Sequence, residues 1–164
     1  MLDQRLLLEM EAYIKTYLSI PNKEEHIVLY SPAESSHYDL EETELENFIK
    51  SKRKPAFTQV LFQFIDQNGA RDSEIYKKAG MDRRHFSKIR SNPAYHPKKN
   101  TAIALALALK LTLEETDELL SAAGYSLSDS ETSDLIIQFC LEKNIHDLDL
   151  INQVLEYFCE KPLF

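Results

Sequence analysis

The side chains with the clearest chemical potential are the cations that lie between Arg83 and Lys99. This window holds six Lys or Arg residues and no Asp or Glu. The wider stretch from Arg71 to Lys110 has ten Lys or Arg and three acids, a net charge of +7, although the whole chain of 164 residues carries −8. A basic patch on an otherwise acidic molecule is typical of a localised anion-binding face. The sequence therefore predicts that this stretch binds an anionic partner.

Patterns typical of catalysis or metal binding are missing from the sequence. It contains no glycine-rich phosphate loop, no nucleophile elbow and no His-containing metal spacing. Cys140 and Cys159 do not form a C-x-x-C pair, and we expect both to be small apolar core residues in a reducing compartment. The sequence predicts no catalytic residue, no metal site, no cofactor and no enzymatic activity. The histidines are expected to be surface or capping residues: His26, His37, His85, His96 and His146.

Two short helices separated by a turn are predicted to position the cations. The apolar spacing predicts helices over 73–79 and 83–91, with Gly80 in the turn between them. Glycine adopts the left-handed conformation that ends a helix without a Cβ clash. Asp82 is a suitable N-cap, because its carboxylate can accept a hydrogen bond from the free N–H groups of the second helix. We expect five side chains to form the inward face of the pair: Ile75, Ala79, Met81, Phe86 and Ile89.

The side chains left outward at the start of the second helix suit recognition of DNA. Arg83, Arg84 and His85 open this helix, and Ser87 and Lys88 follow one turn later. A helix fits the major groove and its N-terminal side chains reach base edges. Arginine can form two hydrogen bonds with guanine, whereas lysine and serine can bond phosphates. The pattern therefore predicts double-stranded DNA as a partner.

The segment SEIYKKAGMDRRHFSKIR (73–90) resembles the helix-turn-helix of the Cro/C1 repressor family, and the resemblance extends over residues 56–124. It implies a five-helix domain whose 113–125 segment is similar to a fifth helix of bacterial members. It also implies that the helix beginning at Arg83 reads the bases and that the helix beginning at Ser73 lies across the DNA backbone. The implied base contacts are Arg83, Arg84 and His85, and the implied phosphate-contacting or flanking residues are Lys88, Arg90, Lys98 and Lys99.

Three features depart from the pattern of that family. Asp72, Ser73 and Glu74 stand where the family often has a glutamine that touches the phosphate backbone. Tyr76 replaces an alanine at a close approach of the two helices, so its ring must tilt outward or be absorbed by altered packing. The connection 91–97 is longer than usual, so the basic loop can lie differently.

Helical periodicity covers most of the chain, so we predict an all-α fold. We expect a five-helix Cro/C1-type helix-turn-helix domain over 55–125, preceded by an acidic helical extension over 1–54 and followed by a helical extension over 126–164. Pro55 suits the first turn of the helix that follows it, and residues 22–40 are expected to form a loop. Leu45, Phe48 and Ile49 are expected to be the buried edge of a helix over 41–52. The other expected helices are 3–18, 57–67, 98–111, 113–123, 131–143 and 148–160.

The sequence also supports expectations about partners. We predict a homodimer, because recognition of two half-sites usually needs two copies, and the first helix and the last two helices are candidate surfaces. The acidic segment 34–46 is a candidate autoinhibitory cover for the basic patch. No apolar run approaches the ~20 residues of a membrane span, so we expect a cytoplasmic protein with no membrane partner.

The predicted function is that of a DNA-binding transcriptional regulator. The alternative is a protein-interaction or adaptor module that keeps the helix-turn-helix fold without sequence-specific DNA binding, because a fold does not determine a function.

Overall fold

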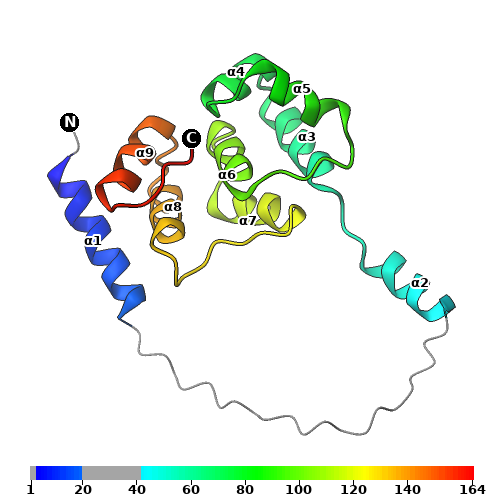
Figure 1. The fold of residues 1–164 in the computed structure, drawn as a ribbon, viewed down its shortest axis with the longest axis horizontal. Coiled ribbons are helices and arrows are strands. Elements are labelled where there is room, and N and C mark those ends of the chain that lie inside the picture. Colours follow the sequence, from blue (N-terminus) through cyan, green and yellow to red (C-terminus); the bar gives the residue numbers. More distant parts are fainter. Residues whose placement is uncertain (1–2, 20–41) are drawn as a thin grey trace, which may run out of the picture. The chain divides into compact units, whose positions relative to one another are not determined.

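The computed structural model describes residues 3–19 and 42–164, which are helical and contain no strand. This confirms the predicted all-α class. The expected loop at 22–40 and most of the acidic segment 34–46 lie outside the described residues. The helices, labelled in Figure 1, are α1 (Gln4–Leu18), α2 (Glu42–Lys52), α3 (Phe57–Asn68), α4 (Asp72–Lys78), α5 (Arg83–Ser91), α6 (Lys99–Ala108), α7 (Leu113–Ala122), α8 (Thr132–Glu142) and α9 (Leu148–Tyr157).

The described residues belong to two compact units. One contains residues 3–19 together with 55–164, and the other contains residues 42–54. Within the first unit α1 contacts α8, and α8 contacts α9. The structure therefore groups the first helix with the C-terminal helices, whereas the division made from the sequence placed it with the rest of residues 1–54.

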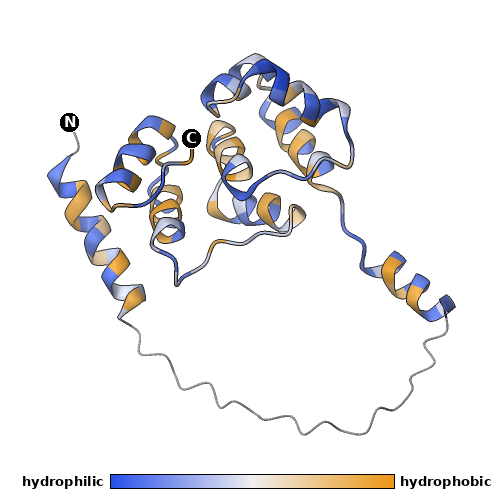
Figure 2. Cartoon of the chain, in the orientation of Figure 1, coloured by the Kyte–Doolittle hydropathy of each residue, from blue (hydrophilic) through white to orange (hydrophobic). Residues whose placement is uncertain are grey.

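Helix α6 is the most deeply buried element of the larger unit. Every residue from Thr101 to Leu109 is buried, and the helix is predominantly hydrophobic in Figure 2. It contacts α4, α7 and α9. Positions 102, 104, 106 and 108 are all alanine. These small side chains allow neighbouring helices to approach closely. This packing fixes α4, and α4 in turn contacts α5.

Local sequence signals explain where several helices begin and end. Thr112 and Glu115 form a capping box at α7, in which the Thr112 hydroxyl accepts from the Glu115 N–H and the Glu115 carboxylate accepts from the Thr112 N–H. Gly69 ends α3 with a φ of 63°. The expectation that Pro55 lies in the first turn of this helix was wrong. Helix α3 begins at Phe57 with Ala56 as its N-cap, so Pro55 precedes the helix. The other predicted helix ends lie within three residues of the observed ones.

The apolar face of helix α1 packs against another helix of the same chain. Met10 and Ile14 are buried, as the spacing predicted. The Tyr13 hydroxyl donates to Glu142 Oε1 at 3.1 Å, and the ring centroids of Tyr13 and Phe139 are 5.3 Å apart. Burial, with hydrogen bonds to neighbouring side chains, raises the pKa of Tyr13. The buried side of this helix, one of the candidate dimerisation elements, therefore packs on α8.

The expected buried edge of α2 is not buried. Leu45, Phe48 and Ile49 remain 47%, 59% and 46% exposed, so this prediction was wrong. Their spacing does place them on one face of a helix, which explains why the helix itself was predicted correctly. Periodicity indicates which face is apolar, but it does not indicate what covers that face.

One of the two cysteine predictions was also wrong. Cys140 lies in α8 and is buried, as expected, whereas Cys159 is exposed. Helix α9 ends at Tyr157, two residues before Cys159, and Cys159 adopts a φ of 59°. The early end of the helix carries this side chain out of the core.

Candidate functional site

The turn between α4 and α5 is closed by backbone hydrogen bonds around Gly80. The N–H of Met81 donates to the carbonyl of Tyr76 at 2.8 Å, and the N–H of Gly80 donates to the carbonyl of Lys77 at 3.2 Å. Gly80 has a φ of 65°, in the left-handed region that favours glycine. The chain therefore reverses direction over a few residues and starts α5 at Arg83.

The inward face of this helix pair was predicted correctly. All five of its expected members are buried, with at most 7% exposure. Tyr76 is half-buried, and its ring centroid lies 6.0 Å from that of Phe86. The tyrosine is thus absorbed by packing between α4 and α5. The inward residues are Ile75, Ala79, Met81, Phe86 and Ile89.

The first turn of α5 presents cations to solvent. Asp82 caps the helix, because its Oδ1 accepts from the N–H of His85 at 2.7 Å. Arg83 and Arg84 follow this cap and are exposed, and Ser87 and Lys88 are exposed one turn later. These four predicted site residues therefore share the outward part of one helix, opposite the buried Phe86 and Ile89.

His85 differs from its arginine neighbours, because its ring is held by another side chain. It is half-buried, and its Nε2 lies 2.7 Å from the hydroxyl oxygen of Tyr95. Tyr95 belongs to the connection between α5 and α6. Burial raises the pKa of Tyr95, so this hydroxyl stays protonated at neutral pH. This contact holds His85, a predicted base-contacting residue, against the connection between α5 and α6.

The connection between α5 and α6, residues 92–98, is anchored at several further points. The buried Thr58 hydroxyl donates to the carbonyl of Pro93 at 2.7 Å, and the Tyr125 hydroxyl donates to the carbonyl of Pro97 at 3.0 Å. The N–H of Ala94 donates to Asn92 Oδ1 at 3.0 Å. The longer loop noted in the sequence is therefore fixed by side chains from α3 and from the segment after α7.

Arg90 is drawn into the packing of three helices. Its guanidinium forms an ion pair with Asp72 of α4, with Nε 2.9 Å from Oδ2. The same group lies over the ring of Phe62 in α3, 4.4 Å from the ring centroid. Both members of the ion pair keep nearly half of their side chains exposed. Arg90 therefore contributes to the fold while still facing solvent.

Lys98 and Lys99 have different environments although they are adjacent. Lys98 is exposed at the N-cap of α6. The ammonium of Lys99 lies 2.5 Å from Oδ2 of Asp134, whose side chain is only 7% exposed. Asp134 also accepts from the N–H of Ser128 at 2.8 Å. The Lys99 ammonium is thus paired with a buried carboxylate of the same chain. The residues near Lys99 in the sequence could not indicate this pairing.

An open hollow of about 610 Å³ lies beside the outward face of α5. The guanidinium-bearing residues Arg71, Arg83 and Arg90 line it, together with Ser87 and Tyr76. Asp72 is the acid on the same wall. Three arginines around one hollow can bind an anion such as a phosphate group. Of these, Arg71 was outside the predicted set of site residues, although it belongs to the basic stretch.

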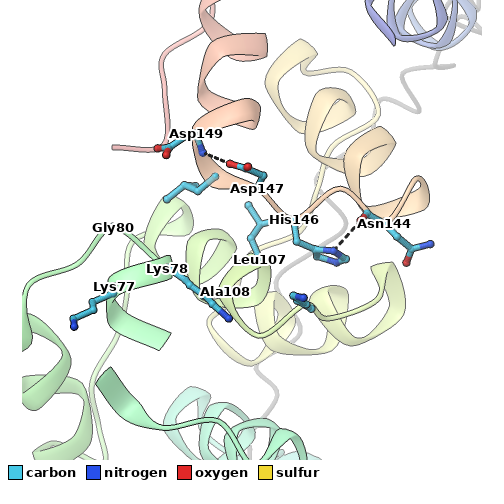
Figure 3. A pocket seen from close by; sticks show the side chains of 11 residues that line it. Lys77, Lys78, Gly80, Leu107, Ala108, Asn144, His146, Asp147 and Asp149 are labelled. Carbon is cyan, nitrogen blue, oxygen red and sulfur yellow. Dashed lines mark hydrogen bonds between the residues drawn. The ribbon is translucent and has the colours of Figure 1, made fainter. Parts of the chain in front are cut away.

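A larger cleft of about 840 Å³ lies between the ends of α4 and α6 and the start of α9 (Figure 3). Its rim combines the cations Lys77, Lys78 and Lys110 with the acids Asp147 and Asp149. Asp147 caps α9, as the dashed line to the Asp149 N–H indicates. The two ring nitrogens of His146 each lie 3.1 Å from a backbone carbonyl oxygen. Sequence reasoning missed this cleft, because its walls come from segments far apart in the chain.

Within residues 3–19 and 42–164, no group of three His, Cys, Asp or Glu side chains could hold a metal ion. In the same part of the chain, no helix is long and apolar enough to cross a membrane. Comparison with protein-family models, with curated proteins and with solved structures found no match.

Proposed function

We propose that this protein binds double-stranded DNA with the outward face of α5 and acts as a transcriptional regulator of the Cro/C1 helix-turn-helix type, as a homodimer. The observation that carries the proposal is the pair of exposed arginines directly after the Asp82 cap. Arg83 and Arg84 project from the first turn of a helix whose opposite side is buried. A helix presented in this way can enter the major groove with its N-terminal end toward the bases.

Charge supports the same surface. The window 83–99 contains six cations and no acid, in a chain of net charge −8. Neutralisation of DNA phosphates by such cations releases counterions and supplies much of the affinity. Acidic surfaces elsewhere on the molecule would discourage DNA from binding in other orientations.

The contacts within the site suggest a division of roles. His85 is bonded to Tyr95, so base reading would depend mainly on Arg83 and Arg84. Ser87, Lys88, Arg90 and Lys98 would bond phosphates, with Arg71 and Arg90 at the hollow beside α5. Lys99 would act through its ion pair with Asp134 rather than on the DNA.

Fluorescence anisotropy with random-sequence duplex DNA over a salt series tests the proposal. We expect binding with a steep salt dependence, and its loss by at least tenfold in Arg83→Ala/Arg84→Ala/Lys88→Ala. The control removes the same number of cations from other elements, in Lys15→Ala/Lys143→Ala/Lys161→Ala. It should reduce affinity much less than the α5 variant does.

The alternative function is a protein-interaction or adaptor module built on the same helices. The absence of DNA binding by the full chain at low salt would favour it. A protein partner captured by the wild type but not by the α5 triple variant would then identify this face as its docking surface.

A further inference from the structure

Exposed apolar side chains are concentrated on α2. The described residues contain seven large hydrophobic side chains that are classed as exposed, and three of them, Leu45, Phe48 and Ile49, belong to this one helix. Residues separated by three and four positions lie on the same side of a helix. No residue of α2 is buried. The three apolar side chains thus share one exposed face of the helix, and hydrophobic and hydrophilic residues alternate along it in Figure 2.

The apolar faces of the other candidate dimerisation helices are already occupied. Helix α1 packs on α8, and α8 buries every residue from Asp134 to Leu141. The buried residues of α9 are Ile151, Val154 and Leu155. Unlike these three helices, α2 has no buried residue.

The charges of α2 are separated along its length. Glu42, Glu44 and Glu46 lie in the first half, and Lys50 and Lys52 lie at the end. This arrangement suits the dipole of the helix, and it also makes the helix complementary to an inverted copy of itself. Two copies that run in opposite directions place acids opposite lysines at both ends, whereas parallel copies place like charges together.

We propose that α2 pairs with α2 of a second copy of this chain, in antiparallel orientation, through Leu45, Phe48 and Ile49. Eleven helical residues span about 16 Å, so the interface is smaller than that of a standard stable complex. The dimer is therefore weak and depends on concentration. It does not require DNA, so it can be tested separately from the proposed DNA binding.

Sedimentation equilibrium of the full chain without DNA tests this pairing. We expect the average mass to rise from monomer toward dimer with concentration, and the dimer to weaken at least tenfold in Phe48→Ser/Ile49→Ser. The control Leu8→Ser/Leu18→Ser removes two exposed apolar side chains from α1 and should leave the association unchanged. A wild-type chain that stays monomeric at millimolar concentration, or a Phe48→Ser/Ile49→Ser variant that associates like the wild type, would overturn the proposal.

Charge reversal tests the orientation. One variant changes Glu42, Glu44 and Glu46 to Lys, and a second changes Lys50 and Lys52 to Glu. Each should associate with itself more weakly than the wild type does, whereas a mixture of the two should recover dimers. A parallel pair would already bring like charges together in the wild type. Wild-type association no stronger than that of either single variant would therefore exclude the antiparallel pair.

Discussion

The ammonium of Lys99, at the start of α6, lies 2.5 Å from the carboxylate of Asp134 in α8. These residues are 35 positions apart in the chain. The pair joins the helix that begins after the basic connection to a C-terminal helix. A cation that the sequence assigned to an anionic ligand is thus the partner of a buried acid, with consequences for stability.

Replacement of Lys99 by Met should lower the free energy of unfolding by about 2 to 3 kcal/mol, because it leaves the Asp134 carboxylate buried without its cation. Urea unfolding measures this loss. The matched control is Lys98→Met, which removes an exposed cation and should change the free energy by about 0.5 kcal/mol or less. Equal losses in the two variants would contradict the structural role of the Lys99 pair.

The ion pair between Asp72 and Arg90 leads to a prediction about DNA affinity, which depends on the proposed function. Asp72→Asn removes an acid beside the arginines of the hollow and releases the Arg90 guanidinium. We expect DNA to bind a few-fold more tightly, with a salt slope steeper by about one counterion. Asp66→Asn, which neutralises an exposed acid in α3, is the control. Unchanged or weaker binding of Asp72→Asn would argue against Arg90 as a phosphate contact.

Gly80 should be the least replaceable of the glycines with positive φ. A Cβ at Gly80 would lie 3.3 Å from Leu148 Cδ2, whereas a Cβ at Gly69 or Gly124 would meet nothing within 4 Å. All three backbones disfavour alanine by about 1 kcal/mol. We therefore expect Gly80→Ala to cost about 2 kcal/mol and the other two about 1 kcal/mol each, as measured by denaturant unfolding.

A second substitution separates the two causes of the Gly80 effect. Leu148→Ala opens space beside the new methyl group but leaves the backbone conformation unchanged. In a double-mutant cycle, Gly80→Ala should cost less in the Leu148→Ala background than in the wild type. Full additivity would show that crowding by Leu148 contributes nothing.

The two cysteines should differ in reactivity. Burial raises the pKa of the Cys140 thiol from its ordinary value of 9.0 to about 12, so at pH 8 the reactive thiolate is nearly absent. Cys159 is exposed. We expect a thiol-specific reagent to modify one thiol per chain in the native protein and two in guanidinium chloride. In Cys159→Ser the native protein should not react, and rapid modification there would contradict the burial of Cys140.

The same pKa shift predicts a pH dependence of stability. Because folding raises the pKa, the contribution of Cys140 is fully present below about pH 9 and decreases as the pH rises toward 12. The free energy of unfolding should therefore fall less between pH 8 and pH 10.5 in Cys140→Ala than in the wild type. Parallel decreases in the two proteins would exclude this linkage.

Local signals in the sequence predicted α5 and its turn accurately. Gly80 supplies the left-handed conformation, and Asp82 supplies the cap, so both ends of the turn are determined by side chains within a few residues of it. The buried face of α5 followed from spacing alone. Arg83 and Arg84 lie on the opposite side of α5 from that buried face, so their exposure could also be predicted from the sequence.

The features that sequence reasoning missed depend on residues distant in the chain. Nothing near Lys99 indicates Asp134, and nothing near His85 shows that its ring bonds to Tyr95 rather than facing solvent. The apolar edge of α2 was recognised from its spacing, but the edge is exposed. Whether such an edge is buried depends on what packs against the helix. Local patterns therefore determine elements and their faces, whereas the pairing of faces and charges depends on tertiary structure.

The anchored connection between α5 and α6 has a thermodynamic consequence. Its backbone is already held by hydrogen bonds from Thr58 and Tyr125, so a ligand that contacts Lys98 does not have to order the loop. The loss of conformational entropy on binding is correspondingly small. Complex formation at this surface should proceed without coupled folding of the connection, and its heat-capacity change should reflect the contact area alone.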